Sequence, residues 1–129
     1  MNIALLEDNP PILDYLSTAL EMLGHTVHKF TNSAPLLETL FIGESARVPL
    51  PYDLALIDLL LPGPISGLET AQMIQQAIPP QQLHMIVISA CSQNELEEAQ
   101  AELQHVPILR KPFKMHELMQ LIDQMQPAG

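Results

Sequence analysis

The stretch that most constrains the fold is residues 52–62, YDLALIDLLLP, near the middle of the chain. Its residues 54–57 are uninterruptedly apolar, which is typical of a strand buried on both faces of a sheet. Asp58 follows directly. Such an aspartate either projects from the carboxyl end of the strand into a crevice, where open α/β sheets bind ligands, or begins a surface turn. The remainder of the chain decides between these two interpretations.

Short apolar segments alternate along the chain with segments whose apolar residues recur at helical spacing. Besides residues 54–57, we predict strands at residues 2–6, 26–30, 83–89 and 106–109, and helices at residues 10–23, 33–42, 68–78, 94–103 and 114–125. Asn9 is a suitable N-cap for the first helix, and Gly24 is a suitable residue to end it. Residues 43–51 show no periodicity and are predicted to be a connector.

Five strands alternating with five helices predict an α/β fold, in which a parallel sheet has helices on both faces. The strand order 2-1-3-4-5 of doubly wound, flavodoxin-like sheets fits this pattern. Pro107 indicates that the last strand lies at a sheet edge. The chain is short enough for one domain, which we place at residues 1–126, with residues 127–129 as the start of a linker or tail.

The charge balance and the apolar runs exclude several classes of protein. Five basic residues stand against fifteen acidic ones, for a formal charge of −10, which argues against direct binding to nucleic acid. No apolar run approaches the ~20 residues of a membrane span, and the N-terminus lacks the pattern of a signal peptide. The single cysteine, Cys91, excludes an internal disulfide and suits a reducing, cytoplasmic location.

Polar side chains follow four of the predicted strands. Glu7 and Asp8 follow the first strand and Asp58 ends the third, so in this topology three carboxylates converge at one crevice. They would repel one another without a cation, and an all-oxygen ligand set favours Mg²⁺. Asp58 is then a candidate nucleophile that forms an aspartyl phosphate. Ser89 and Lys111, at the ends of the fourth and fifth strands, would add a hydroxyl donor and a cation.

The acid pair, the DLLLP of residues 58–62, Ser89-Ala90 and Lys111-Pro112-Phe113 together resemble the receiver domain of two-component response regulators. The resemblance covers residues 1 to about 125. It implies that a phosphohistidine of a sensor histidine kinase or a histidine phosphotransfer protein phosphorylates Asp58. It further implies that Glu7, Asp8, Asp58 and the backbone carbonyl of Leu60 hold Mg²⁺.

In the same resemblance, Ser89 hydrogen-bonds the phosphoryl group, Lys111 forms an ion pair with it, and the Lys111–Pro112 peptide is cis. Such a domain phosphorylates and dephosphorylates itself but is not a conventional enzyme. Phosphorylation would switch the surface made by the fourth helix, the fifth strand and the fifth helix. The resemblance also allows a homodimer through that surface.

Two departures from the family pattern concern the output of the site. The switch position three residues before Lys111 is usually aromatic, but here it is Ile108, which cannot move between ring-in and ring-out states. The route from Ser89 to the surface is therefore left open. In addition, Gly67 lies one residue further from Asp58 than is usual, and Pro64 and Ser66 replace the usual Met-Asp before it, so we expect a reshaped loop.

Leu60 and Cys91 lie two positions after Asp58 and Ser89, and neither side chain readily orients an attacking water. We therefore expect slow spontaneous loss of phosphate. Two alternatives remain from the sequence. One is a degenerate receiver-like interaction module that is not phosphorylated. The other is a doubly wound hydrolase with an Asp nucleophile, which is disfavoured because Leu60 stands where its second acid would be.

Overall fold

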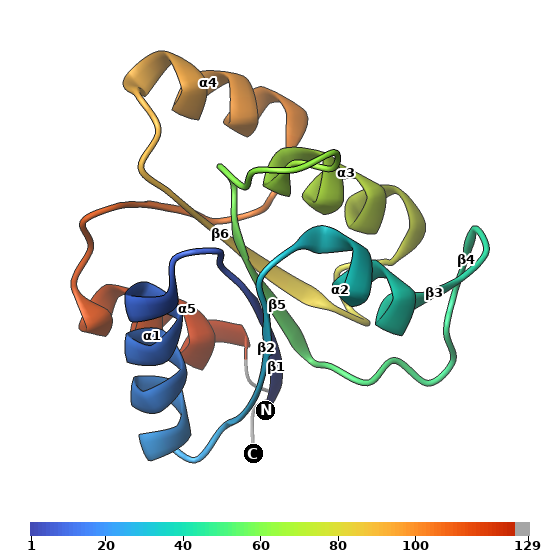
Figure 1. Cartoon of the computed structure of the whole chain (residues 1–129), viewed down its shortest axis with the longest axis horizontal. Coiled ribbons are helices and arrows are strands. Elements are labelled where there is room, and N and C mark those ends of the chain that lie inside the picture. Colours follow the sequence, from blue (N-terminus) through green and yellow to red (C-terminus); the bar gives the residue numbers. More distant parts are fainter. Residues whose placement is uncertain (126–129) are drawn as a thin grey trace.

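A computed structural model describes residues 1–125 of the chain; the linker predicted at residues 127–129 lies outside this part. Five strands form one parallel sheet: β1 (Asn2–Leu6), β2 (Thr26–Phe30), β5 (Leu54–Asp58), β6 (His84–Ser89) and β7 (Ile108–Arg110). Their order is β2-β1-β5-β6-β7, which is the predicted 2-1-3-4-5 once the strands of the main sheet alone are counted. Figure 1 labels β2, β1, β5 and β6 of this sheet. The doubly wound fold is therefore confirmed.

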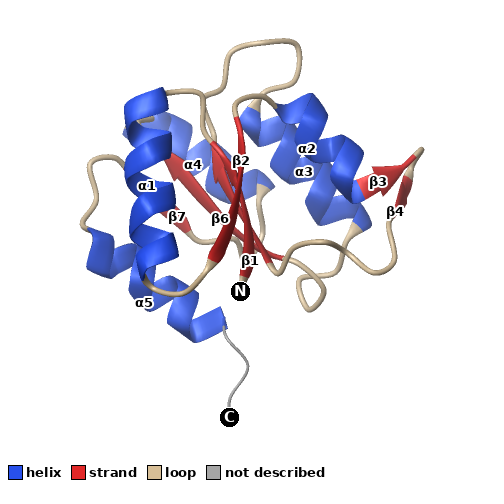
Figure 2. Cartoon of the chain, turned by 60° about the horizontal axis from the view of Figure 1, so that its bottom comes forward, coloured by secondary structure: helices blue, strands red, loops and turns tan. Residues whose placement is uncertain are grey.

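Helices cover both faces of this sheet. They are α1 (Pro10–Met22), α2 (Ser33–Leu40), α3 (Gly67–Ala77), α4 (Gln93–Glu102) and α5 (Met115–Met125). Buried residues of α2, α3 and α4 form one core with one face, and those of α1 and α5 form a second core with the other. Figure 2 shows α1 and α5 together on one side and α2 and α3 together on the opposite side.

The central strand β5 is apolar throughout because each of its two faces meets a helical layer. Leu54 and Leu56 pack into the core under α1 and α5, whereas Ala55 and Ile57 pack into the core under α2, α3 and α4. All four side chains are fully buried. Burial of a large aliphatic side chain contributes about 1.5–3 kcal/mol. This two-sided burial holds the end of β5, and so Asp58, in a fixed place.

Local signals set where the helices begin and end. The Asn9 side chain accepts a hydrogen bond from the backbone N–H of Ile12 at 3.2 Å, as its predicted role as N-cap requires. Gly24 follows α1 with a φ of +94°, a conformation that glycine adopts readily. Ser66 and Ser92 each form a capping box, at the start of α3 and α4 respectively. Both of these boxes lie directly after the loops that leave β5 and β6.

The segment after α2 differs from the prediction. The helix predicted to reach residue 42 ends at Leu40, and Phe41 is extended, with φ −125° and ψ 149°. Phe41–Ile42 forms β3, which pairs with β4 (Ser45–Ala46) in a short antiparallel hairpin that lies apart from the main sheet (Figure 1). Strands of two residues are too short to show a period of two, so β3 was predicted as the end of the helix and β4 as part of the connector.

The last strand also differs in extent. β7 begins at Ile108 rather than at residue 106, and it lies at the sheet edge as predicted. Pro107 has no N–H to donate, but its carbonyl accepts a hydrogen bond from Val87 N at 2.9 Å. Within residues 1–125, no helix has both the length and the apolar character needed to cross a membrane.

Candidate functional site

Three carboxylates meet where β1 and β5 end. Leu6 pairs with Ile57 in the parallel register, so Glu7 and Asp58 follow at neighbouring positions on the two strands. One oxygen from each of Glu7, Asp8 and Asp58 lies within 4.8 Å of the others. Glu7 is fully buried and Asp58 is 4% exposed, whereas Asp8 is half-buried. The structure thus brings together the three carboxylates that the sequence placed at this crevice.

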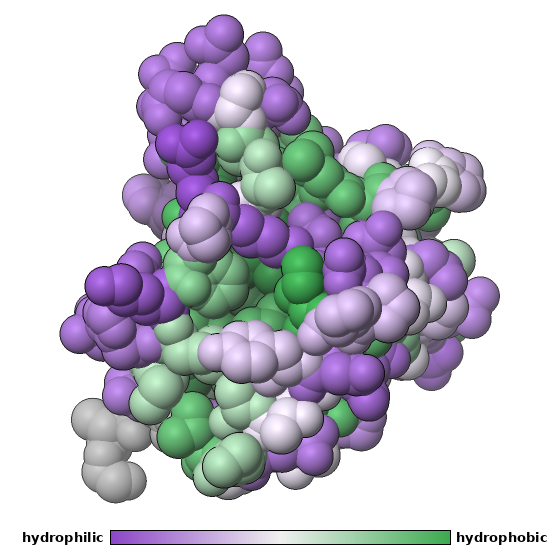
Figure 3. Space-filling model, turned by 60° about the vertical axis from the view of Figure 1, so that its left-hand side comes forward, coloured by the Kyte–Doolittle hydropathy of each residue, from purple (hydrophilic) through white to green (hydrophobic). Residues whose placement is uncertain are grey.

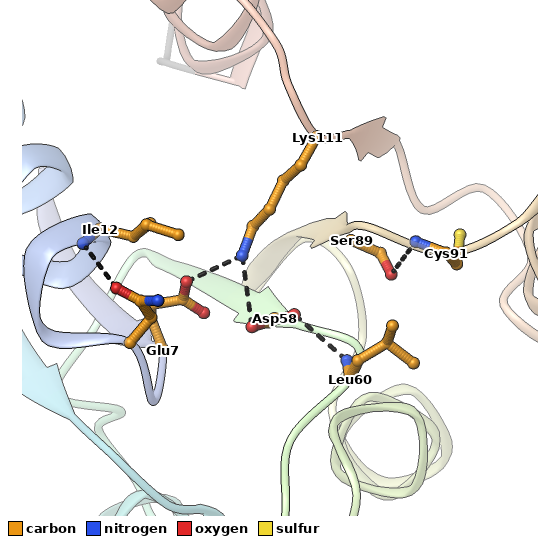
Figure 4. Close-up of polar contacts among 8 residues, drawn as sticks. Glu7, Ile12, Asp58, Leu60, Ser89, Cys91 and Lys111 are labelled. Carbon is orange, nitrogen blue, oxygen red and sulfur yellow. Dashed lines mark hydrogen bonds and ion pairs between the residues drawn. The ribbon is translucent and has the colours of Figure 1, made fainter.

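Lys111 supplies the cation that faces this cluster. Its Nζ lies 2.8 Å from Glu7 Oε1 and 3.4 Å from Asp58 Oδ2 (Figure 4). The backbone N–H of Lys111 donates to the Ser89 carbonyl at 2.7 Å, and this bond fixes the start of the side chain. The Lys111–Pro112 peptide is cis, as the resemblance implies. One ammonium against three carboxylates leaves the pocket with an excess of negative charge.

The pKa values of Glu7 and Lys111 reflect both burial and this excess of negative charge. Burial, together with the neighbouring Asp58 carboxylate, raises the pKa of Glu7 to about 7, although Lys111 opposes the change. Burial alone would lower the pKa of Lys111, but its hydrogen bond to Glu7 and the charge of Asp58 outweigh that effect and raise it. Both directions mean that the site is stabilised by additional positive charge.

The carboxylates fit a magnesium ion. Within residues 1–125, Glu7 Oε2 is buried and has no hydrogen-bond partner, which is costly for a carboxylate oxygen unless a ligand satisfies it. Mg²⁺ takes oxygen ligands, commonly one or two carboxylates together with water. Leu60 donates its backbone N–H to Asp58 Oδ1 at 3.1 Å, so its peptide lies beside the same carboxylate. The role of the Leu60 carbonyl as a ligand stays a prediction.

Ser89 ends β6, next to the strand that carries Asp58, and is fully buried. Its Oγ accepts a hydrogen bond from the backbone N–H of Cys91 at 3.1 Å (Figure 4). This contact occupies the oxygen as an acceptor and leaves the O–H free to donate. Ile108 lies on β7, where it is half-buried and packs into the core under α2, α3 and α4. The two residues therefore lie on adjacent strands.

The loop after Asp58 is held by residues whose roles were not predicted. A Cβ at Gly67 would lie 1.9 Å from the carbonyl oxygen of Asp58, so only glycine allows α3 to approach the strand this closely. Ser33 Oγ donates to the Ile65 carbonyl at 3.2 Å, and Thr70 Oγ1 donates to Ser33 Oγ at 2.7 Å. In the sequence, the only indication of these contacts was that Ser33 and Thr70 lie on the apolar faces of α2 and α3.

Comparisons with known proteins agree on one family. A family model described as response regulator receiver domain matches residues 3–123. Among solved structures, the response regulator TrrA from Thermotoga maritima, in complex with Mg²⁺ and BeF, has a TM-score of 0.76 and 25% identity, over 97% of this chain and 98% of that one.

Two further structures show the same fold. The receiver domain of a sensor histidine kinase from Pseudomonas aeruginosa, with magnesium in its active site cleft, has a TM-score of 0.78 and 24% identity, over 96% of this chain and 95% of that one. A CheY-like receiver domain from Methanospirillum hungatei has a TM-score of 0.75 and 21% identity, over 95% and 90%. Among curated proteins, no significant match is found.

Proposed function

This chain belongs to the response regulator receiver domain family, and on that premise we propose that it accepts a phosphoryl group on Asp58. One observation carries the proposal: the Asp58 carboxylate ends the central strand 3.4 Å from the Lys111 ammonium and in one cluster with the carboxylates of Glu7 and Asp8. Asp58 is 4% exposed, and it lies at the carboxyl ends of the strands, where doubly wound sheets bind ligands.

In the proposed reaction an Asp58 oxygen attacks the phosphorus of a phosphohistidine. The new O–P bond forms as the N–P bond breaks, and the imidazole leaves with the electron pair of that bond. Lys111 Nζ, already 3.4 Å from Asp58 Oδ2, is placed to pair with a phosphoryl oxygen. We propose that the O–H of Ser89 donates to another. Fixed charges and donors of this kind account for most catalysis of phosphoryl transfer.

Glu7, Asp8 and Asp58 would hold Mg²⁺, with the carbonyl of Leu60 as a further ligand. The ion would neutralise charge on the transferring phosphoryl group. The unpartnered Glu7 Oε2 and the raised pKa of Glu7 support such an ion, since both mark a pocket with too little positive charge. The TrrA and Pseudomonas structures hold magnesium, which is consistent with this assignment.

The phosphoryl donor we propose is a sensor histidine kinase or a histidine phosphotransfer protein in the cytoplasm. The output surface we propose consists of α4, β7 and α5, through which a homodimer could also form. Only Ala99 of α4 is buried, and the outer surface of this helix is hydrophilic (Figure 3, top). A helix with so little buried area is held loosely enough to shift when the adjoining loop moves.

Intact mass tests the proposal directly. The full chain is incubated with Mg²⁺ and a small phosphodonor such as acetyl phosphate, together with the variants Asp58→Asn and Asp14→Asn. Asp14 is an exposed carboxylate on α1 and serves as the matched control. The parent chain and Asp14→Asn should gain the mass of one phosphoryl group, and Asp58→Asn should not. A parent chain that gains no mass would favour the interaction module that is not phosphorylated.

A further inference from the structure

Arg110 links three elements next to the proposed phosphorylation site. Its Nη2 donates to the carbonyl of Cys91 at 3.2 Å, and its Nη1 donates to the side-chain carbonyl of Gln93 at 3.2 Å. Cys91 lies in the loop after β6, Gln93 is the first residue of α4, and Arg110 is the last residue of β7. One guanidinium therefore ties the loop, the helix and the edge strand together.

The strand residue just before this loop, Ser89, carries the hydroxyl that would sense the phosphoryl group. Cys91 donates its backbone N–H to Ser89 Oγ at 3.1 Å, while its carbonyl accepts from Arg110. If the Ser89 side chain moves toward an oxygen on Asp58, its Oγ moves away from Cys91 N, which lengthens that hydrogen bond and displaces the peptide. Because the guanidinium binds the other side of the same residue, a displacement of Cys91 reaches Arg110 through a single hydrogen bond.

The position of Arg110 on β7 matters as well. Side chains alternate along a strand, so Arg110 projects to the same face as Ile108, two residues earlier. Ile108 packs into the core on the α4 side of the sheet. An aliphatic side chain there has no polar contact with the loop, whereas Arg110 reaches the loop with two donors. On the face of β7 toward α4, Arg110 thus provides a polar contact with the loop beside the site.

We propose that Arg110 is a positioning residue that couples the loop after Ser89 to β7 and to the start of α4. The coupling rests on the proposed function, since it acts only once a group on Asp58 draws in Ser89. This coupling would take the place of the aromatic switch that the chain lacks at Ile108. Arg110 touches neither Asp58 nor the acidic pair, so its removal leaves the phosphoryl site itself intact.

The backbone offers a rival route that the experiment has to separate. Lys111 N donates to the Ser89 carbonyl at 2.7 Å, and Ser89 pairs in register with Arg110 along the sheet. If these bonds alone carried the signal, the Arg110 side chain would be dispensable. Substitution of that side chain keeps every backbone bond and therefore isolates its contribution.

The test uses the full chain with Mg²⁺ and beryllofluoride, and it records the amide NMR shifts of residues 89–93 and 108–110. Arg110→Ala is compared with the parent and with Arg47→Ala, an exposed arginine that binds the Glu38 carbonyl away from the site. In all three, we expect beryllofluoride to shift the amides of residues 58 and 89. In Arg110→Ala alone, the shifts of residues 108–110 and 93 should fall by roughly half or more.

The outcomes separate this inference from the proposed function. Full-sized shifts at residues 108–110 in Arg110→Ala, with a normal response at residue 89, would overturn the coupling and leave the phosphorylation of Asp58 untouched. No response at residue 58 in the parent chain would overturn the proposed function and the coupling with it. Reduced shifts at residues 108–110 in Arg47→Ala as well would also refute the specific role of Arg110.

Discussion

Replacement of Gly67 by alanine should destabilise the chain strongly, because the added methyl group has no room. Its Cβ would lie 1.9 Å from the Asp58 carbonyl oxygen and 2.8 Å from the carbonyl carbons of Asp58 and Leu59. All three atoms are backbone, so no side chain can rotate to relieve the contact. Either the end of β5 or the start of α3 must move by about 1 Å or more to restore an ordinary separation.

The expected cost follows from overpacking at a buried junction. Extra methyl groups forced into packed regions cost about 1–3 kcal/mol, and a clash with fixed backbone belongs at the upper end. The free energy of unfolding of a domain of this size is about 5–15 kcal/mol, so Gly67→Ala should still fold at low temperature. A loss of about 3 kcal/mol lowers the Tm by roughly 10 °C. Urea denaturation and a thermal scan measure both quantities.

The sign of the change in stability distinguishes a clash at residue 67 from an open position. Gly67 is the first residue of α3 and, unlike Gly24, has no positive φ, so alanine there would meet no backbone strain if space allowed. Gly24→Ala is the matched control, because nothing lies within 4 Å of its Cβ and only its φ of +94° opposes the substitution. If Gly67→Ala proves as stable as the parent, the close approach of α3 to Asp58 is refuted.

Three further predictions concern the site itself. Leu60→Asn and Cys91→Glu should each shorten the lifetime of the phosphorylated chain, since a polar group there can orient water; unchanged decay of the phosphorylated mass in both would refute this. Lys111→Met should destabilise the metal-free chain by about 3 kcal/mol in urea, because it leaves Glu7 without its ammonium, and Mg²⁺ should restore part of the loss. The raised pKa of Glu7 means that the folded, metal-free chain holds a proton that the unfolded chain loses near pH 4.5, so stability should fall as pH rises toward about 7. With a chelator present, Glu7→Gln should abolish this dependence of the free energy of unfolding on pH. The same slope against pH in Glu7→Gln and the parent would contradict the prediction.

The strand ends were predictable because they follow from topology alone. In a parallel sheet every carboxyl end lies at one edge, so a polar residue directly after an apolar run is placed without knowledge of its contacts. This rule brought Glu7 and Asp58 together from positions fifty-one residues apart, and the structure has them in one cluster. It also located Ser89 and Lys111 at the same edge. Their chemical roles remain proposals, since geometry alone does not test them.

The features that were not predicted depend on contacts between segments far apart in the sequence, which a periodic pattern does not indicate. The apolar stripe of α2 continues into Phe41, so spacing alone extended the helix, although the backbone turns extended there and begins the hairpin. From the sequence, either Asn32 or Ser33 can cap α2; the structure has Asn32 as the N-cap, and the Ser33 hydroxyl binds the Ile65 carbonyl thirty-two residues away. No pattern in the sequence indicates that Arg110, at the end of β7, bonds to Cys91 and Gln93, which follow the neighbouring strand β6.

The two loops beside Asp58 are held very differently, and this difference bears on how the site responds. The loop after Asp58 is fixed at its α3 end, by the tight contact of Gly67 with the Asp58 backbone and by the bond from Ser33 to Ile65. The loop after Ser89 is held by the bond from Cys91 N to Ser89 Oγ and by Arg110, at distances of 3.1 and 3.2 Å. In the proposed function, a phosphoryl group on Asp58 would draw Ser89 Oγ away from Cys91 N and so loosen the second loop, whereas the contacts of Gly67 and Ser33 do not involve the Asp58 carboxylate. The adjustment should therefore pass toward α4 and β7, and the α3 side should act as the rigid support.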